Sequence, residues 1–225
     1  MREGVCQLSS SNPTVKLKRS RREEVIIQKA SEMFPKQGIE PVKMTEIATA
    51  SGVGVASLYR YFGTKVNLAL SAGALIWRSF NETFAENLTS GFDDKDGISQ
   101  MEELFELYVF MYRRHPEFIS FLDELDHMVL DTEPDEARLA EYDEEVMRFF
   151  PLFAASYAKG VEDGTIRPDV EFMLYYQTVS HALMGVAQKL IRGEILPSDD
   201  FSHGWVELQM AVDISMRYLE PNPQM

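Results

Sequence analysis

The chain has 225 residues, 45% of them apolar, and a formal net charge of −14. That apolar content suffices for a sizeable core and argues against wholesale disorder, while no apolar run approaches the roughly 18 residues that a membrane span requires. The single cysteine cannot form an internal disulfide, and the N-terminus has no apolar segment typical of a secretory signal, so we expect a cytoplasmic protein.

The charge is distributed unevenly along the chain. Residues 1–65 contain 11 Lys+Arg and 6 Asp+Glu, a net charge of +5, whereas the remaining 160 residues contain 11 and 30, a net charge of −19. A cationic end joined to an anionic body favours a nucleic-acid-binding N-terminus. The alternative is a solvated basic tail without a partner.

The first 88 or so residues predict a tail and four helices. Residues 1–19 contain serines, a proline and spaced basic residues and predict a flexible basic tail. A first helix follows over about residues 20–37, where Ser20 and Glu23 fit a capping box. Pro35 should disturb its last turn and Gly38 should end it. Two short helices over about residues 45–51 and 55–62 precede a long helix over about residues 65–88.

The rest of the chain predicts further helices. Helical periodicity recurs over about residues 98–114, 116–130, 134–162, 170–192 and 202–219. Pro151 lies inside the third of these segments and should kink it. No run of short β-branched segments separated by hairpin turns is present. The sequence therefore predicts an all-α fold of about nine helices.

The two short helices, joined by a glycine turn and preceded by a longer helix, fit a helix-turn-helix unit. Its apolar set comprises Ile47, Ala48, Val53, Leu58 and Phe62. The outer face of the second short helix then comprises Val55, Ala56, Ser57, Tyr59, Arg60 and Tyr61. Small residues at the start of such a helix allow close approach to the floor of a DNA groove, and the hydroxyls and guanidinium that follow can contact bases and phosphates.

This segment resembles the DNA-binding domain of the TetR family of bacterial regulators. The stretch VKMTEIATASGVGVASLYRYFGTKVNL, residues 42–68, matches the family pattern at Ile47, Ala48, Gly52, Val53, Leu58, Tyr59, Tyr61, Phe62, Lys65 and Leu68. The close resemblance covers about residues 20–70. It implies a DNA-binding domain over residues 20–66 and a ligand-binding and dimerisation domain over residues 67–225.

The resemblance also implies contacts with double-stranded DNA. Ser57, Tyr59 and Tyr61 match positions that commonly touch DNA, Val55 and Ala56 lie where base-facing residues occur, and Lys65 matches a phosphate contact. Thr45 falls in another contact region. Lys43 replaces the usual capping threonine but can reach a phosphate, and Arg60 can contribute to base recognition. The alternative for the two tyrosines is packing between helices.

The last two predicted helices are candidates for a homodimer interface. Their apolar stripes comprise Phe172, Tyr176, Val179, Leu183, Val186 and Leu190, and Trp205, Leu208, Val212, Ser215 and Leu219. The resemblance implies that such helices pair across a two-fold axis into a four-helix bundle, which would place two DNA-binding domains on a palindromic operator. The alternative is that both stripes face the core of their own subunit.

The middle helices are candidates for a ligand cavity because they are rich in methionine and aromatic residues. The candidate ligand-binding residues are Tyr108, Met111, Tyr112, Phe118, Asp126, Met147, Phe150, Gln177 and His181. The alternatives are an ordinary core for the apolar members and solvated or hydrogen-bonded positions for the polar ones.

The sequence gives little support for catalysis. The histidines at 115, 127, 181 and 203 form no obvious metal-ligand pair, and neither a nucleophile elbow nor a phosphate-binding glycine loop is present. We therefore expect no cofactor or metal. The interpretation is a ligand-responsive repressor released from its operator by a small apolar or aromatic effector. The alternatives are a helical small-molecule-binding protein that does not bind DNA, and an all-α enzyme.

Overall fold

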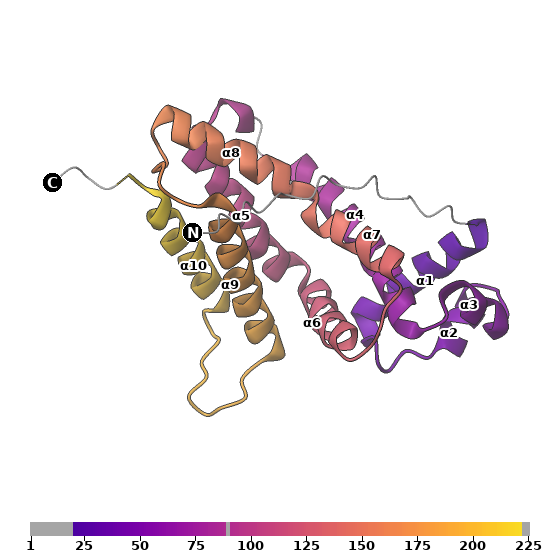
Figure 1. The fold of residues 1–225 in the computed structure, drawn as a ribbon. Helices are drawn as coiled ribbons and strands as arrows, with labels where there is room; N and C mark the ends of the chain where they lie inside the picture. The colour runs from indigo at the N-terminus through magenta and orange to yellow at the C-terminus, as the bar shows by residue number, and fades with distance from the viewer. Residues whose placement is uncertain (1–19, 89–90, 222–225) are drawn as a thin grey trace, which may run out of the picture.

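The computed structural model describes residues 20–88 and 91–221, and the predicted basic tail lies outside these residues (Figure 1). Within the described residues the fold is entirely helical. The α-helices are α1 (Arg21–Gln37), α2 (Met44–Ala50), α3 (Val55–Phe62), α4 (Lys65–Asn87), α5 (Gly97–Arg114), α6 (Pro116–Leu130), α7 (Glu136–Val146), α8 (Phe150–Asp163), α9 (Phe172–Arg192) and α10 (Gly204–Leu219), with the short 3₁₀ helices η1 (Phe92–Asp94) and η2 (Met147–Phe149). The prediction of an all-α fold is confirmed.

Two prolines act differently from the prediction. The segment 134–162 forms two helices, α7 and α8, separated by η2, and Pro151 lies in the first turn of α8 instead of kinking a single helix. A proline is tolerated there because the N–H that it lacks would have no partner within the helix. Helix α1 continues through Pro35 as far as Gln37, where the Gly38 N–H donates to the Phe34 carbonyl at 2.9 Å.

The first three helices form a small unit around a shared apolar core. Ser20 caps α1 through the expected capping box with Glu23. Phe34, Ile47 and Leu58 are fully buried where α1, α2 and α3 meet. This packing fixes how α3 is presented, because the same apolar residues that hold it leave its opposite face to solvent.

Helix α4 leaves this unit and runs along α7 into the larger body of the molecule (Figure 1). Helix α5 packs against both α8 and α10. At the start of α5, a Cβ built on Gly97 would lie 2.0 Å from the Gly160 nitrogen of α8, so only glycine permits this close crossing.

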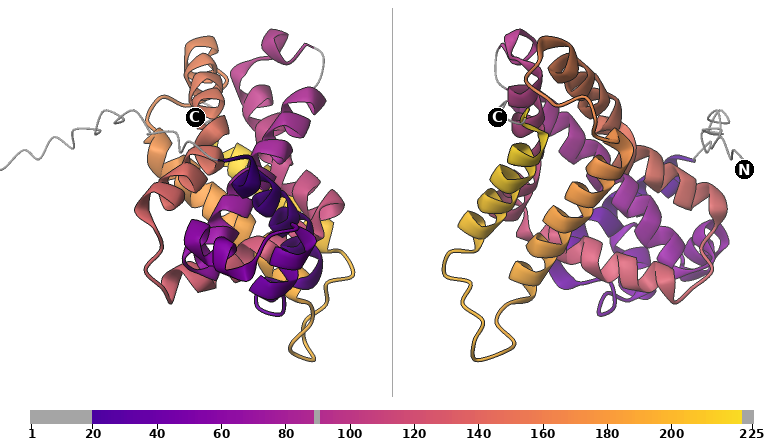
Figure 2. Two further views of the ribbon diagram at one scale, coloured as in Figure 1. Left: turned by 90° about the vertical axis from the view of Figure 1, so that its right-hand side faces the viewer. Right: turned by 60° about the vertical axis from the view of Figure 1, so that its left-hand side comes forward.

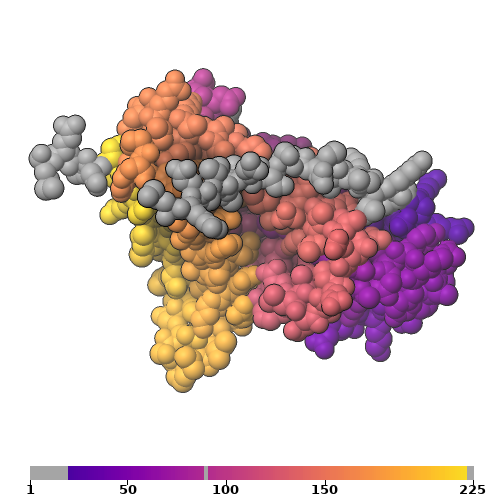
Figure 3. Space-filling view, viewed as in Figure 1, coloured from indigo at the N-terminus to yellow at the C-terminus, as the bar shows by residue number. Residues whose placement is uncertain are grey.

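Helices α9 and α10 lie side by side at the opposite end of the molecule from α1–α3 (Figure 2). The space-filling view shows the same separation, with the indigo and purple N-terminal helices at one end and the orange and yellow C-terminal helices at the other (Figure 3). None of the helices in the described residues is long and apolar enough to cross a membrane.

Candidate nucleic-acid interface and internal cavity

Helix α3 presents the predicted contact residues on an accessible face. Tyr59 is 49% exposed, Ala56 and Arg60 are exposed, and Val55, Ser57 and Tyr61 are half-buried. The Arg60 guanidinium lies 5.3 Å from the centroid of the Tyr61 ring, a cation–π geometry that holds the arginine against the helix surface. The face therefore offers an aromatic hydroxyl and a guanidinium to a ligand outside the protein.

The remaining predicted contact residues flank α3. Lys43 and Thr45 are exposed at the start of α2. As expected, the Lys43 side chain does not cap that helix, and the Glu46 carboxylate instead accepts a hydrogen bond from the Lys43 N–H at 3.0 Å. The half-buried Lys65 ammonium donates to the Glu40 carbonyl at 2.7 Å, and burial lowers its pKa. Two of its three donors remain for an anion.

Helix α7 holds the C-terminal end of α3 through a buried arginine. Arg138 donates to the Tyr61 carbonyl at 2.9 Å and to the Ser71 hydroxyl at 2.8 Å. Its guanidinium also lies 4.7 Å from the centroid of the Phe62 ring. Asn67 of α4 donates to the Phe62 carbonyl at 2.9 Å. These bonds satisfy carbonyls that the end of a helix leaves without a partner, and they connect α3 to two helices of the body.

Helix α6 makes a third connection to the N-terminal unit. The Glu124 carboxylate accepts a hydrogen bond from the Ile39 N–H at 2.6 Å, between α6 and the segment that joins α1 to α2. Three body helices, α4, α6 and α7, are thus hydrogen-bonded to the unit that presents α3.

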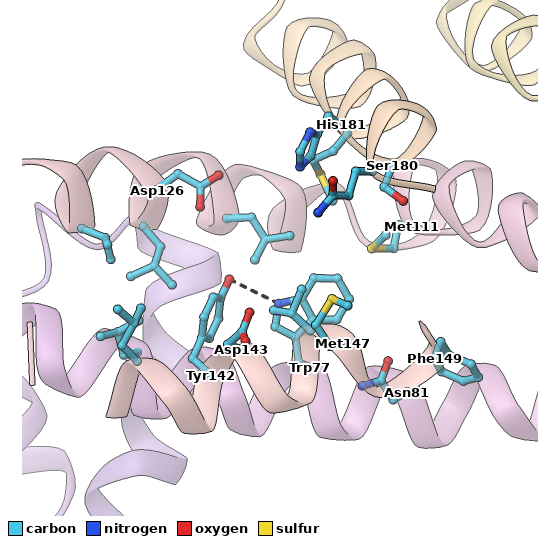
Figure 4. Close-up of a pocket in the computed structure, with 18 of the residues that line it drawn as sticks. Trp77, Asn81, Met111, Asp126, Tyr142, Asp143, Met147, Phe149, Ser180 and His181 are labelled. Atoms are coloured by element: carbon cyan, nitrogen blue, oxygen red, sulfur yellow. Dashed lines mark hydrogen bonds between the residues drawn. The ribbon is translucent and has the colours of Figure 1, made fainter. Parts of the chain in front are cut away.

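The same three helices, with α5, η2, α8 and α9, line a half-open cavity of about 950 Å³ (Figure 4). Its wall is mostly apolar and aromatic, and its volume lies at the upper end of the range of small-molecule sites. On α4 and α7, the Trp77 indole N–H donates to the Tyr142 hydroxyl at 3.3 Å. Burial raises the pKa of the Tyr142 hydroxyl, and the nearby Asp126 and Asp143 carboxylates add to that shift.

The cavity includes six of the predicted ligand-binding residues: Tyr108, Met111, Asp126, Met147, Gln177 and His181. The other three lie elsewhere. Tyr112 approaches Gly204 of α10, Phe118 packs edge-on against Trp77 with centroids 4.9 Å apart, and the Phe150 ring packs 5.1 Å from the Tyr176 ring.

Sequence reasoning missed several cavity residues, including Trp77, Asn81, Tyr142, Asp143 and Ser180. Two of them carried a detectable signal, because Trp77 and Asn81 are one helical turn apart and a tryptophan N–H in an apolar stripe needs a partner. Tyr142 is placed by the close approach of α7 to α4, where a Cβ built on Gly73 would lie 2.8 Å from Cε2 of the tyrosine ring. Only the packing of the two helices reveals this contact.

The expected dimer stripes require a correction. Most of their residues are buried within the single chain: Tyr176, Val179, Leu183, Leu190, Leu208, Val212 and Leu219. Periodicity identified the buried faces of α9 and α10 because each helix must first cover its own core. Of the predicted stripes, Trp205 is exposed, and the other large apolar residues that these helices expose are Leu174, Val206, Met210, Ile214 and Tyr218. Dimerisation itself remains a prediction.

Comparison with known proteins finds similarity to bacterial transcriptional regulators. Residues 26–72 match the family model described as bacterial regulatory proteins, tetR family. The chain is 30% identical over 142 residues to the HTH-type transcriptional repressor NicS of Pseudomonas putida, covering 63% of this chain and 66% of the repressor, just under two thirds of its length.

Solved structures share the fold at low identity. A transcriptional regulator of Saccharomonospora viridis in complex with choline has a TM-score of 0.63 at 18% identity, with 87% of this chain and 97% of that chain covered. The fatty acid degradation regulator FadR of Bacillus halodurans has a TM-score of 0.60 at 17% identity, with 92% and 99% covered.

Proposed function

We propose that this chain, which belongs to the TetR family of bacterial regulatory proteins, is a homodimeric transcriptional repressor that a small molecule releases from DNA. One observation supports this most strongly. The helices that wall the cavity, α4, α6 and α7, also hold the unit that presents Tyr59 and Arg60. A protein that only stored a ligand would not need its cavity walls bonded to an exposed polar helix.

Each subunit places α3 in the major groove of an operator half-site. Ala56 allows close approach of the backbone, Tyr59 and Arg60 contact bases or phosphates, and Lys43 and Lys65 contact phosphates on either side. The acidic body repels DNA and confines docking to the cationic end.

Two copies associate through the exposed apolar face of α9 and α10. Val206, Met210 and Ile214 follow one another at intervals of one helical turn and are all exposed. A continuous exposed apolar stripe of this kind is typical of a protein–protein contact, and a two-fold axis through it would leave both DNA-binding ends free.

Effector binding displaces the cavity walls and with them the two α3 helices. Filling the cavity shifts α4 and α7 relative to each other, and Asn67 and Arg138 transmit the shift to the end of α3. A change in the separation of the two recognition helices weakens operator binding. Coupling free energies of about 1–3 kcal/mol correspond to roughly 5- to 150-fold release.

The test is DNA binding by variants matched in charge. Duplexes retained by the full chain from a random pool would be sequenced, and the affinity for the selected duplex measured by fluorescence anisotropy. Arg60→Ala should weaken binding by about 1–3 kcal/mol, and Lys43→Ala should lower the salt slope by about one. Arg114→Ala removes an exposed charge from the end of α5 and should have little effect. Retention of no duplex, or equal losses in all three variants, would contradict the proposal.

A further inference from the structure

The ionisable residues of the cavity wall are almost all acidic. Asp126, Glu136 and Asp143 contribute carboxylates, whereas the described lining contains neither lysine nor arginine. His181 is the one lining side chain there that can carry a positive charge. An anionic ligand would therefore bring its charge towards carboxylates with at most an imidazolium to offset them.

Two of these carboxylates, Asp126 and Asp143, also form no ion pair within the described residues. Asp126 accepts only a long hydrogen bond of 3.4 Å from the Gln188 amide, and Asp143 has no ion pair. Both residues are exposed at the mouth of the cavity, although the protein packed around the Asp126 carboxyl raises its pKa.

Two neighbouring carboxylates outside the cavity wall have arginine partners. Asp123, one turn before Asp126 on α6, pairs with Arg192 at 2.5 Å. Glu145, two residues beyond Asp143 on α7, pairs with Arg78 at 2.6 Å. Arginine thus neutralises Asp123 and Glu145, whereas Asp126 and Asp143 have no such partner. The negative charges of Asp126 and Asp143 are therefore available to a cationic ligand that enters the cavity.

Aromatic side chains accompany these carboxylates. Asp143 lies beside Tyr142 and Trp77, while Met111 and Phe149 line the wall farther from Asp126 (Figure 4). The face of a tryptophan or tyrosine ring attracts cations, and the attraction strengthens where water is excluded. The apolar part of the wall suits the hydrocarbon or aromatic remainder of the same molecule.

We propose that the effector is an organic cation with an apolar or aromatic body, such as a protonated amine or a quaternary ammonium compound. Its positive charge lies between Asp126 and Asp143 against the Trp77 and Tyr142 rings, and its apolar body extends towards Met111. That this ligand acts as an effector rests on the proposed function. The preference of the cavity for a cation does not depend on that function.

The test uses three compounds that share a phenylbutyl body and differ in charge: 4-phenylbutylamine, 4-phenylbutan-1-ol and 4-phenylbutyrate. Binding to the full chain at pH 7.5 would be measured by calorimetry. Quenching of Trp77 fluorescence in a Trp205→Phe background locates the bound compound in the cavity, because the chain has two tryptophans. The amine should bind on the order of tenfold or more tighter than the alcohol, and the carboxylate should bind weakest.

Removing the carboxylates should remove the preference. In the double variant Asp126→Asn and Asp143→Asn the amine should lose on the order of tenfold in affinity while the alcohol is unchanged. Glu144→Gln changes an exposed carboxylate that lies next to Asp143 but outside the cavity wall and should leave the order intact. A variant whose alcohol affinity equals that of the parent chain has kept its fold.

Three results would overturn the inference: no binding by any of the compounds, an alcohol or carboxylate that binds as tightly as the amine, or a preference that survives in the double variant. The DNA-binding assay remains independent. A chain that binds its selected duplex without preferring the amine retains the proposed function and loses only the cationic effector. A chain that prefers the amine but binds no duplex retains the cation-binding cavity and loses the proposed DNA-binding function.

Discussion

Replacing Arg138 with methionine tests whether α7 holds α3 in the position that the proposed DNA binding requires. Methionine keeps an unbranched apolar side chain of similar length but cannot donate. The Tyr61 carbonyl and the Ser71 hydroxyl each lose a charged donor, at 2.9 Å and 2.8 Å respectively, and the Phe62 ring loses its cation–π partner. The side chain of Arg138 is buried, so water replaces these bonds poorly.

The expected size follows from these contacts. Hydrogen bonds to charged groups contribute about 1.5–3 kcal/mol each, and removing the buried guanidinium regains part of its desolvation cost. We therefore expect Arg138→Met to lower the free energy of unfolding by roughly 2–4 kcal/mol, which for a chain of this size lowers the melting temperature by about 5–15 °C. Operator affinity should fall about tenfold, because the turn that includes Tyr59 and Arg60 loses its attachment to the body.

The assay combines thermal unfolding with fluorescence anisotropy on the selected duplex at a temperature where both proteins are folded. Arg148→Met is the matched control, because Arg148 pairs with Glu145 at 3.1 Å with its side chain 48% exposed. A surface pair of this kind contributes about 0–1 kcal/mol, so the control should change neither property much. Unchanged operator affinity in a folded but destabilised Arg138→Met protein would refute the role of α7 in positioning α3.

Three further perturbations test the packing, the assembly and the electrostatics. Gly97→Ala should lower the free energy of unfolding by ~3 kcal/mol or more in urea titrations, because the new methyl meets the Gly160 backbone; an unchanged midpoint would show that the helices separate easily. Ile214→Glu should raise the dimer dissociation constant at least about tenfold in light scattering, whereas Ala85→Glu, at an exposed site on α4, should not; a dimer that survives Ile214→Glu would place the interface elsewhere. Burial raises the pKa of Asp126 in the native state, so its contribution to stability is present below the unfolded pKa and is lost as pH rises through the native pKa. Asp126→Asn should therefore raise the melting temperature at pH 7.5 but not at pH 4, and a gain that is equal at both values would contradict this.

The sequence by itself determined the local structure and the helix-turn-helix arrangement of α2 and α3. Helix periodicity, the Ser20 cap and the terminating glycines lie within a few residues of one another, so their physical effect does not depend on the rest of the fold. The same holds for the pattern from Ile47 to Phe62, where spacing alone separates the buried face of α3 from its exposed face. The observed bounds of α3 equal the predicted ones.

Only the tertiary structure decided which side chains share a cavity and which face remains for a partner. Trp77, Tyr142 and Asp126 come from three helices and meet because α4, α6 and α7 cross at particular heights. On α10, periodicity placed Leu208 and Val212 on an apolar stripe that was expected to face a second copy. Both residues instead cover the core of their own chain. A one-dimensional pattern records that a residue avoids water, and it does not record whether its neighbour is the same chain, a second copy or a ligand.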